Sequence, residues 1–186
     1  MTSAGADPRD NDLVAAARAG QAWALTEIWN RYAAAVTGYL RGRGAHDPED
    51  VTSEVFLAVF ERLPRFHGDD NDLRAFVFTV AHHRLVDDVR RRSRRGEPLP
   101  YDATDDSRTH PSAESDALDR LADQRVRDLL ETLSPDQRDV LLLRVVADLS
   151  LEQTADVVGK RVGAVKALQH RALATMRRLL EQAVSL

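Results

Sequence analysis

The chain has 186 residues, 26 Lys and Arg against 30 Asp and Glu, a net charge of −4 and no cysteine. The lack of cysteine excludes a disulfide scaffold, a thiolate metal site and a cysteine nucleophile. No apolar run approaches the roughly 18 residues of a membrane helix, and residues 1–12 lack the apolar core of a signal peptide. We therefore expect a cytoplasmic globular protein. Its net negative charge argues against a protein that coats nucleic acid without a partner.

The first half of the chain shows apolar residues at helical spacing and no strand-like alternation. One periodic stretch covers residues 25–40 and ends at Gly42 and Gly44, and a second begins at 47–50 and ends at Pro64. Residues 65–72 are expected to form a polar loop, and a third stretch runs from Leu73 into the basic residues 90–95. The pattern predicts a disordered N-terminus over residues 1–10 and a helical domain over residues 11–95.

Residues 96–117 differ in composition, with three of the seven prolines, six acids and one arginine. This segment predicts a flexible acidic linker. Periodicity then resumes at Leu118, and the segments 134–137 and 150–153 each combine a serine N-cap with glutamine at the third helical position. The predicted fold class is all-α, with a second small helical domain over residues 118–182.

The segment after Ser150 has the spacing of a DNA-binding helix-turn-helix: a short helix, a turn containing Gly159, and a longer helix over about 162–180. We expect Val158, Val165 and either Leu168 or Ala172 to close the angle between the two helices. The local charge of residues 150–186 is +3. The candidate DNA contacts on the outer face are Lys160, Arg161, Lys166, Gln169, His170 and Arg171. An ordinary helical bundle with solvated charges is the alternative.

Three phenylalanines of the first domain, Phe66, Phe76 and Phe78, cluster in the sequence with basic residues. Residues 82–95 hold six arginines and two aspartates, a local charge of +4. Aromatic rings can stack on unpaired bases for about 1–3 kcal/mol each while arginines contact the backbone. Two alternatives stay open: the phenylalanines belong to the core, and the arginines form a solvated helix end.

Three segments together resemble extracytoplasmic-function (ECF, group 4) sigma factors of the sigma-70 family. DPEDVTSEVFLAVFERLPRF (47–66) resembles the helix that docks on the polymerase clamp. LRAFVFTVAHHRLVDDVRRR (73–92) resembles the region that recognises and melts the promoter −10 element. LSPDQRDVLLLR (133–144), LSLEQTA (149–155) and GAVKALQHRA (163–172) resemble the domain that reads the −35 element. The three segments occur in the family's order and spacing, and together the match covers nearly the whole chain.

The resemblance implies an RNA polymerase sigma factor that binds core polymerase, recognises both promoter elements and promotes promoter opening. It implies polymerase contacts at Asp50, Glu54, Phe56 and Phe60, with exposed phenylalanines beside acids. The alternative is that Phe56 and Phe60, four residues apart, belong to the core. The loop from Gly68 to Asp72 would capture a flipped base. The implied −10 binding and melting residues are His67, Gly68, Asp69, Asn71, Arg74, Phe76, Phe78, His82, His83, Arg84, Arg90 and Arg91.

The implied partners are bacterial core RNA polymerase, through its clamp helices and flap, and promoter DNA, as duplex at −35 and single strand at −10. Members of this family are often held by an anti-sigma factor. No cofactor, metal, membrane or enzyme activity is expected, because no histidine has HExxH or ExxH spacing. His83 and Asp87 could form only a weak two-ligand metal site.

Four departures from the family pattern concern DNA recognition. Phe76 stands where tryptophan is usual, Leu168 where arginine is frequent and Ala167 where serine is frequent. The Gly159-Lys160-Arg161 turn lacks an N-cap. The alternatives to a sigma factor are a stand-alone regulator with a LuxR-type helix-turn-helix and a helical adaptor whose basic patches meet an acidic protein.

Overall fold

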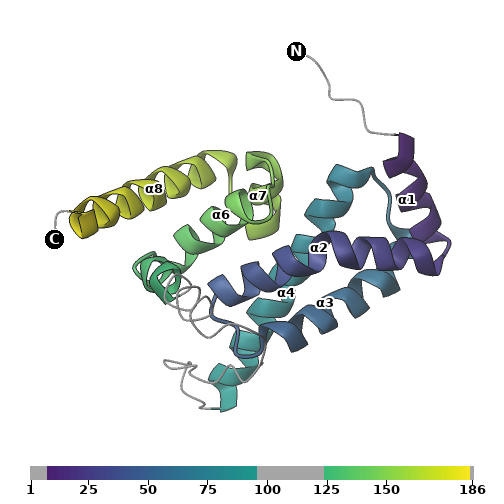
Figure 1. Ribbon diagram of the computed structural model, residues 1–186, viewed down its shortest axis with the longest axis horizontal. Helices are drawn as coiled ribbons and strands as arrows, with labels where there is room; N and C mark the ends of the chain where they lie inside the picture. The colour runs from purple at the N-terminus through teal and green to yellow at the C-terminus, as the bar shows by residue number, and fades with distance from the viewer. Residues whose placement is uncertain (1–7, 96–123, 185–186) are drawn as a thin grey trace, which may run out of the picture.

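The computed structural model describes residues 8–95 and 124–184 of the chain. All regular secondary structure in these two ranges is helical, as the all-α prediction requires (Figure 1). Within the same ranges no helix is both long and apolar enough to cross a bilayer. The predicted acidic linker, 96–117, and the predicted start of the second domain, 118–123, lie outside the described residues.

The first helical unit contains α1 (Pro8–Arg18), α2 (Ala22–Gly42), α3 (Pro48–Arg62), a short 3-10 turn (Leu63–Arg65) and α4 (Asp70–Arg95). α1 begins inside the segment predicted to be a disordered N-terminus, so that prediction is wrong for residues 8–10. α3 begins as predicted, with the Asp47 side chain accepting a hydrogen bond from the Asp50 amide (2.9 Å) and proline in the first turn.

The start of α4 corrects the predicted loop over residues 65–72. The Asp69 carboxylate accepts from the Asp72 amide (3.0 Å), and the Asp72 carboxylate accepts from the Asp69 amide (3.1 Å). This reciprocal pair is a capping box built from two aspartates. The helix therefore begins at Asp70, and residues 70–72 form its first turn instead of a loop.

The second helical unit contains a helix over residues 124–131, followed by α6 (Pro135–Val145), α7 (Leu151–Val158) and α8 (Val162–Val184). Both predicted capping boxes are present, at Ser134 with Gln137 and at Ser150 with Gln153. Gly159 ends α7 in the left-handed conformation (φ 64°), which glycine adopts without strain. α8 extends four residues past its predicted end at Leu180.

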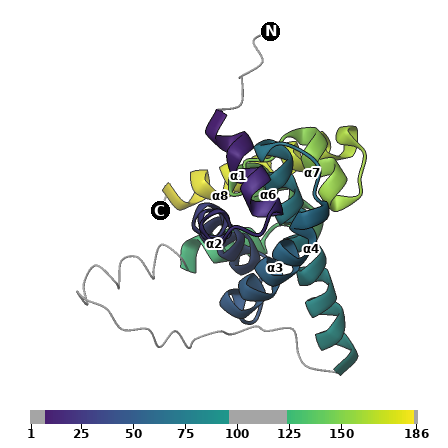
Figure 2. The same ribbon diagram turned by 90° about the vertical axis from the view of Figure 1, so that its right-hand side faces the viewer.

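The two units pack against each other along two helix pairs, α2 with α6 and α4 with α7 (Figures 1 and 2). One continuous hydrophobic cluster includes Leu40 from the first unit and Leu142 from the second. Glycines allow the close approach: a Cβ atom at Gly42 would lie 2.9 Å from Leu142 Cδ1, and one at Gly38 would lie 3.7 Å from Val146 Cγ1. The sequence did not predict this docking.

Candidate nucleic-acid interface

The helix-turn-helix in the second unit has a core of its own. Val140, Ala155, Val165 and Leu168 form a separate buried cluster, with Val158 packed beside it. On α8, positions 165, 168 and 172 point inward because residues three and four apart share one helix face. The predicted closure of the angle between the two helices by Val158, Val165 and Leu168 is confirmed, and Ala172 is also fully buried.

The opposite face of α8 carries the predicted −35 contacts. Lys166, His170 and Arg171 are exposed there, Gln169 is half-buried, and Arg161 is exposed just before the helix begins. Lys160 differs, because its Nζ atom lies 2.9 Å from a carboxylate oxygen of Asp136 within the same unit. Lys160 and Arg161 flank the N-terminus of α8, which begins at Val162 and whose amides and dipole favour phosphate.

The basic residues of α4 line a cavity between the two units. This cavity has a volume of about 600 Å³, and the polar side chains of α4 that line it are His82, His83, Arg84, Asp87 and Arg90. Its opposite wall is formed by residues 156–159 at the end of α7. Arg91 is exposed on the same helix, where its guanidinium lies 3.7 Å from Asp88 and 3.8 Å from Glu54.

The two phenylalanines predicted to assist strand separation have different environments. Phe78 is 1% exposed and packs edge-on against Tyr39 in the core, with ring centres 6.1 Å apart. Direct contact between Phe78 and DNA therefore does not fit the structure. Phe76 is half-buried and lies against Phe66, with ring centres 5.3 Å apart. Of the pair, Phe76 alone keeps a ring accessible for stacking.

The predicted base-capture segment lies at the start of α4. His67, Asp69 and Asn71 are exposed there, and Asp69 is also committed to the capping box. Gly68 has φ 153° and no room for a side chain, since a Cβ atom would lie 2.5 Å from Asp72 Cβ. Glycine is therefore required at this position, because any side chain would collide with Asp72 in the first turn of α4.

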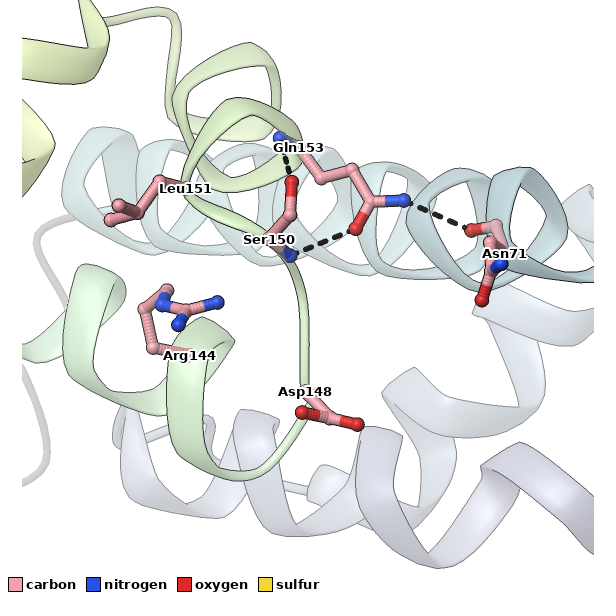
Figure 3. Close-up of a pocket in the computed structure, with 6 residues that line it drawn as sticks. All are labelled: Asn71, Arg144, Asp148, Ser150, Leu151 and Gln153. Atoms are coloured by element: carbon pink, nitrogen blue, oxygen red, sulfur yellow. Dashed lines mark hydrogen bonds between the residues drawn. The ribbon is translucent and has the colours of Figure 1, made fainter. Parts of the chain in front are cut away.

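A second cavity, of about 580 Å³, joins this segment to the second unit (Figure 3). Its lining includes Asn71 from α4, Asp148 from the loop after α6, and Gln153 from α7. The Gln153 amide nitrogen donates to the Asn71 backbone carbonyl (3.2 Å), and Arg74 lies 3.2 Å from the Asp148 carboxylate. Two of the predicted −10 residues are thus already in contact with the second unit.

The predicted polymerase-binding helix α3 needs one correction. Phe56 is 1% exposed and packs against Trp29 (4.7 Å between ring centres) and Phe60 (5.7 Å), so the expected exposed Phe56 is wrong. Asp50 is exposed, and Glu54 and Phe60 are half-buried. Leu57 is 65% exposed on the same helix and was missed. The exposure of Leu57 could have been predicted, because this apolar residue lies outside the helical stripe formed by residues 51, 55 and 59.

A buried polar network joins the two units at the centre of their interface. Asp139 of α6 is 6% exposed, lies 2.5 Å from Arg43 Nε, and accepts a hydrogen bond from the Tyr39 hydroxyl (2.9 Å). His82 Nδ1 lies 2.9 Å from the same hydroxyl. Because tyrosine has one proton, which goes to Asp139, the neutral imidazole donates from Nδ1 to the tyrosine oxygen.

Burial controls the protonation of this network. Burial raises the pKa of Tyr39 well above its usual 10.0, and the negative charge of Asp139 adds to that increase. Burial also lowers the pKa of His82 below 6.5; Asp139 opposes this shift, while Arg43 and His83 reinforce it. Both groups are therefore neutral at pH 7, and the charge pair in the network is Arg43 with Asp139.

Comparison with known protein families matches the two units separately. The model of sigma-70 region 2 matches residues 28–95, and the model of sigma-70 region 4 matches residues 123–176. The chain is 36% identical over 171 residues to the ECF RNA polymerase sigma factor SigD of Mycobacterium tuberculosis, covering 87% of this chain and 79% of SigD. It is 33% identical over 171 residues to the ECF sigma factor BldN of Streptomyces coelicolor, covering 91% of this chain and 65% of BldN.

Two solved structures resemble the whole arrangement. CnrH, in complex with the cytosolic domain of CnrY, has a TM-score of 0.68 and 26% identity over 93% of this chain and 97% of that one. RpoE from Bartonella quintana, in complex with the anti-sigma factor NepR, has a TM-score of 0.64 and 21% identity over 84% and 96% of the two chains. The fold and the two matched regions define a bacterial transcription initiation factor of the sigma-70 type. The chain belongs to the ECF RNA polymerase sigma factors.

Proposed function

We propose that this chain binds bacterial core RNA polymerase, recognises the −35 and −10 promoter elements, and opens the promoter for transcription. The observation that supports this most strongly is the presence of two separate basic surfaces, one in each sigma-70 region. The division into domains over residues 11–95 and 118–182, with the acidic segment 96–117 between them, is part of this proposal.

The −35 element is assigned to α8. Lys166, His170 and Arg171 are exposed over its first turns, where a recognition helix contacts base edges in the major groove. Arg161 stands at the helix start, where it can bind phosphate. Lys160 is given a weaker role because its ion pair with Asp136 must compete with DNA.

The −10 element is assigned to the start and the basic face of α4. Phe76 supplies an aromatic face for an unstacked base, supported from behind by Phe66. Asn71 and its neighbours read the flipped base, and His83, Arg84 and Arg90 hold the backbone.

Replacing Phe76 with alanine tests the melting role. The Phe76→Ala protein should bind core polymerase normally and show reduced permanganate reactivity of promoter thymines. Phe76→Trp keeps a stacking face and should restore that reactivity. If Phe76→Ala opens DNA as well as the parent protein, Phe76 is only structural.

The polymerase surface is assigned to the exposed side of α3, with Leu57 at its centre and Asp50 and Glu54 beside it. Leu57→Glu should weaken core polymerase binding without loss of folding, because the side chain is 65% exposed. Val145→Glu is a matched control on α6, where an aliphatic side chain is 69% exposed. Equal affinity of the Leu57→Glu and Val145→Glu proteins for core polymerase would remove Leu57 from the interface.

The remaining assignments follow from the family. We infer that the protein performs no bond chemistry, works in the cytoplasm with the polymerase, and has an anti-sigma factor as a partner. RpoE is solved in complex with the anti-sigma factor NepR, and CnrH is solved in complex with the cytosolic domain of CnrY. The alternative is a stand-alone regulator, which tight and specific promoter binding without polymerase would favour.

A further inference from the structure

One polar side chain ties the start of α4 to the neighbouring helix of the first unit. In residues 67–72, the base-capture segment, Asp70 is the one residue that is not exposed. Its side chain is 16% exposed and is turned toward α2. The residues on either side of it, Asp69 and Asn71, are exposed and belong to the set assigned to the flipped base. The contacts of Asp70 therefore determine how the first turn of α4 presents its neighbours.

Two consecutive residues of α2 hold the Asp70 carboxylate. Arg31 Nη1 donates to Asp70 Oδ1 at 2.8 Å, and the Tyr32 hydroxyl donates to the same oxygen at 3.3 Å. Both donors meet an ionised acceptor, and the shorter contact with Arg31 is also an ion pair. Because Asp70 is the first residue of α4, these contacts constrain where that helix begins relative to α2.

The surroundings keep both donors in place. Tyr32 is 3% exposed. Burial raises the pKa of Tyr32 above its usual 10.0, and the negative charge of Asp70 adds to that increase while Arg31 and Arg74 oppose it. The hydroxyl therefore keeps its proton and donates it. Glu27 lies one turn before Arg31 on α2, with 3.6 Å between its carboxylate and Arg31 Nη2, so the guanidinium is held between two carboxylates.

Arg31 also controls the charge of the surface assigned to single-stranded DNA. The base-capture segment contains three aspartates, Asp69, Asp70 and Asp72. Asp69 and Asp72 cap α4, where the positive end of the helix dipole offsets their charge. The charge of Asp70 would repel the phosphates of a strand bound beside it. The ion pair with Arg31 neutralises that charge.

We propose that Arg31 and Tyr32 are positioning residues for base capture. They hold Asp70 in place and thereby set the position of Asn71, the adjacent residue assigned to the flipped base. Arg31 also removes a repulsive charge from the path of the strand. Neither side chain is assigned a contact with the base itself. This inference rests on the proposed function for the identity of the ligand, a single-stranded −10 element, and it adds α2 to the residues that serve its capture.

Amide hydrogen exchange of the polymerase-free protein tests the positioning step without DNA. The Asp72 and Leu73 amides donate to the carboxylate and the backbone carbonyl of Asp69 in the first turn of α4. Arg31→Ala should accelerate exchange of these two amides about fivefold, which corresponds to the roughly 1 kcal/mol of a partly exposed ion pair. Tyr32→Phe keeps the buried ring and should give a smaller acceleration.

Two further variants separate positioning from the simple loss of a side chain. Arg41→Ala removes an ion pair from the same helix, because Arg41 lies 2.6 Å from Glu49 of α3. It should leave exchange at the start of α4 unchanged. Arg31→Lys keeps the positive charge and should restore most of the protection. Equal exchange of these amides in the Arg31→Ala and Arg41→Ala proteins would overturn the proposal.

Base preference of the holoenzyme tests the functional step. Promoters are first selected from a random DNA library by transcription with core polymerase and the parent protein. Holoenzyme binding to a single-stranded oligonucleotide with the selected −10 sequence is then compared with binding to versions in which one base at a time is replaced by an abasic site. At the position where the parent protein needs the base most, Arg31→Ala should reduce the preference for the intact oligonucleotide about fivefold. Arg31→Lys should restore the preference, and Arg41→Ala should keep it.

The two measurements distinguish the possible failures. If the parent protein selects no promoter, the proposed function fails, and exchange still decides whether Arg31 and Tyr32 position the start of α4. If Arg31→Ala accelerates exchange and leaves the base preference unchanged, the contact is only structural and the proposal is overturned.

Discussion

Asp139→Asn is the most informative single change, because it removes the charge of the interdomain network and keeps its shape. The Asp139 carboxylate is 6% exposed and contacts both Arg43 and Tyr39. Breaking a buried ion pair costs about 3–5 kcal/mol when the orphaned charge stays buried. Here Arg43 regains water when the units separate, so the cost is closer to the 1.5–3 kcal/mol of a hydrogen bond to a charged group. We take about 2 kcal/mol, which is roughly a 30-fold shift toward separated units.

The assay measures that shift through the reactivity of a single buried thiol. Leu142 is 6% exposed and lies against Gly42, so Leu142→Cys places the only thiol of the chain inside the interface. Its alkylation rate reports the separated fraction and should rise roughly 30-fold when Asp139→Asn is added. Asp136→Asn is the matched control on the same helix, because Asp136 pairs with Lys160 within its own unit. Equal alkylation rates in the two proteins would refute the electrostatic account of docking.

Three further predictions use separate measurements. Burial lowers the pKa of His82 in the docked form, so docking is strongest above pH 6.5 and weakens as the pH falls toward that lowered pKa. Alkylation of the Leu142→Cys thiol should therefore accelerate on acidification, and a rate independent of pH would contradict this. Ser150→Ala removes the side-chain cap on the Gln153 amide (3.1 Å) and should cost about 1 kcal/mol of unfolding free energy in urea titrations; an unchanged midpoint would show that the cap contributes nothing. Arg171→Ala should reduce affinity for a −35 duplex by about 1–3 kcal/mol if it reads a base, whereas an equal loss on all sequences would mark a phosphate contact.

Features encoded by neighbouring residues were predictable from the sequence. Ser134 and Ser150 each cap a helix through a glutamine three residues later, and Gly159 ends α7, so the limits of the helix-turn-helix followed from local chemistry. The aspartate box at Asp69 and Asp72 uses the same chemistry without serine or glutamine. Interpreting that polar run as a loop hid the first turn of α4.

Features that depend on distant residues were not predictable in the same way. Phe76 and Phe78 are two residues apart, and helical spacing indicates only that they face different sides. Phe78 is the buried one because Tyr39 of α2 packs against it. The docking of the two units depends on a contact between Tyr39 and Asp139, 100 residues apart, and on two glycines that carry no pattern of their own. Only the packed structure shows that these residues meet.

Binding to core RNA polymerase tests the central claim most directly. Purified protein is mixed with bacterial core polymerase and separated on a sizing column, with the Gly42→Trp protein examined in parallel. We predict that the wild-type protein co-elutes with the polymerase. Gly42→Trp should do so at least as well, because an indole at residue 42 collides with Leu142 and should separate the two units. If both proteins are folded and both elute apart from the polymerase, the sigma factor account of this chain is contradicted.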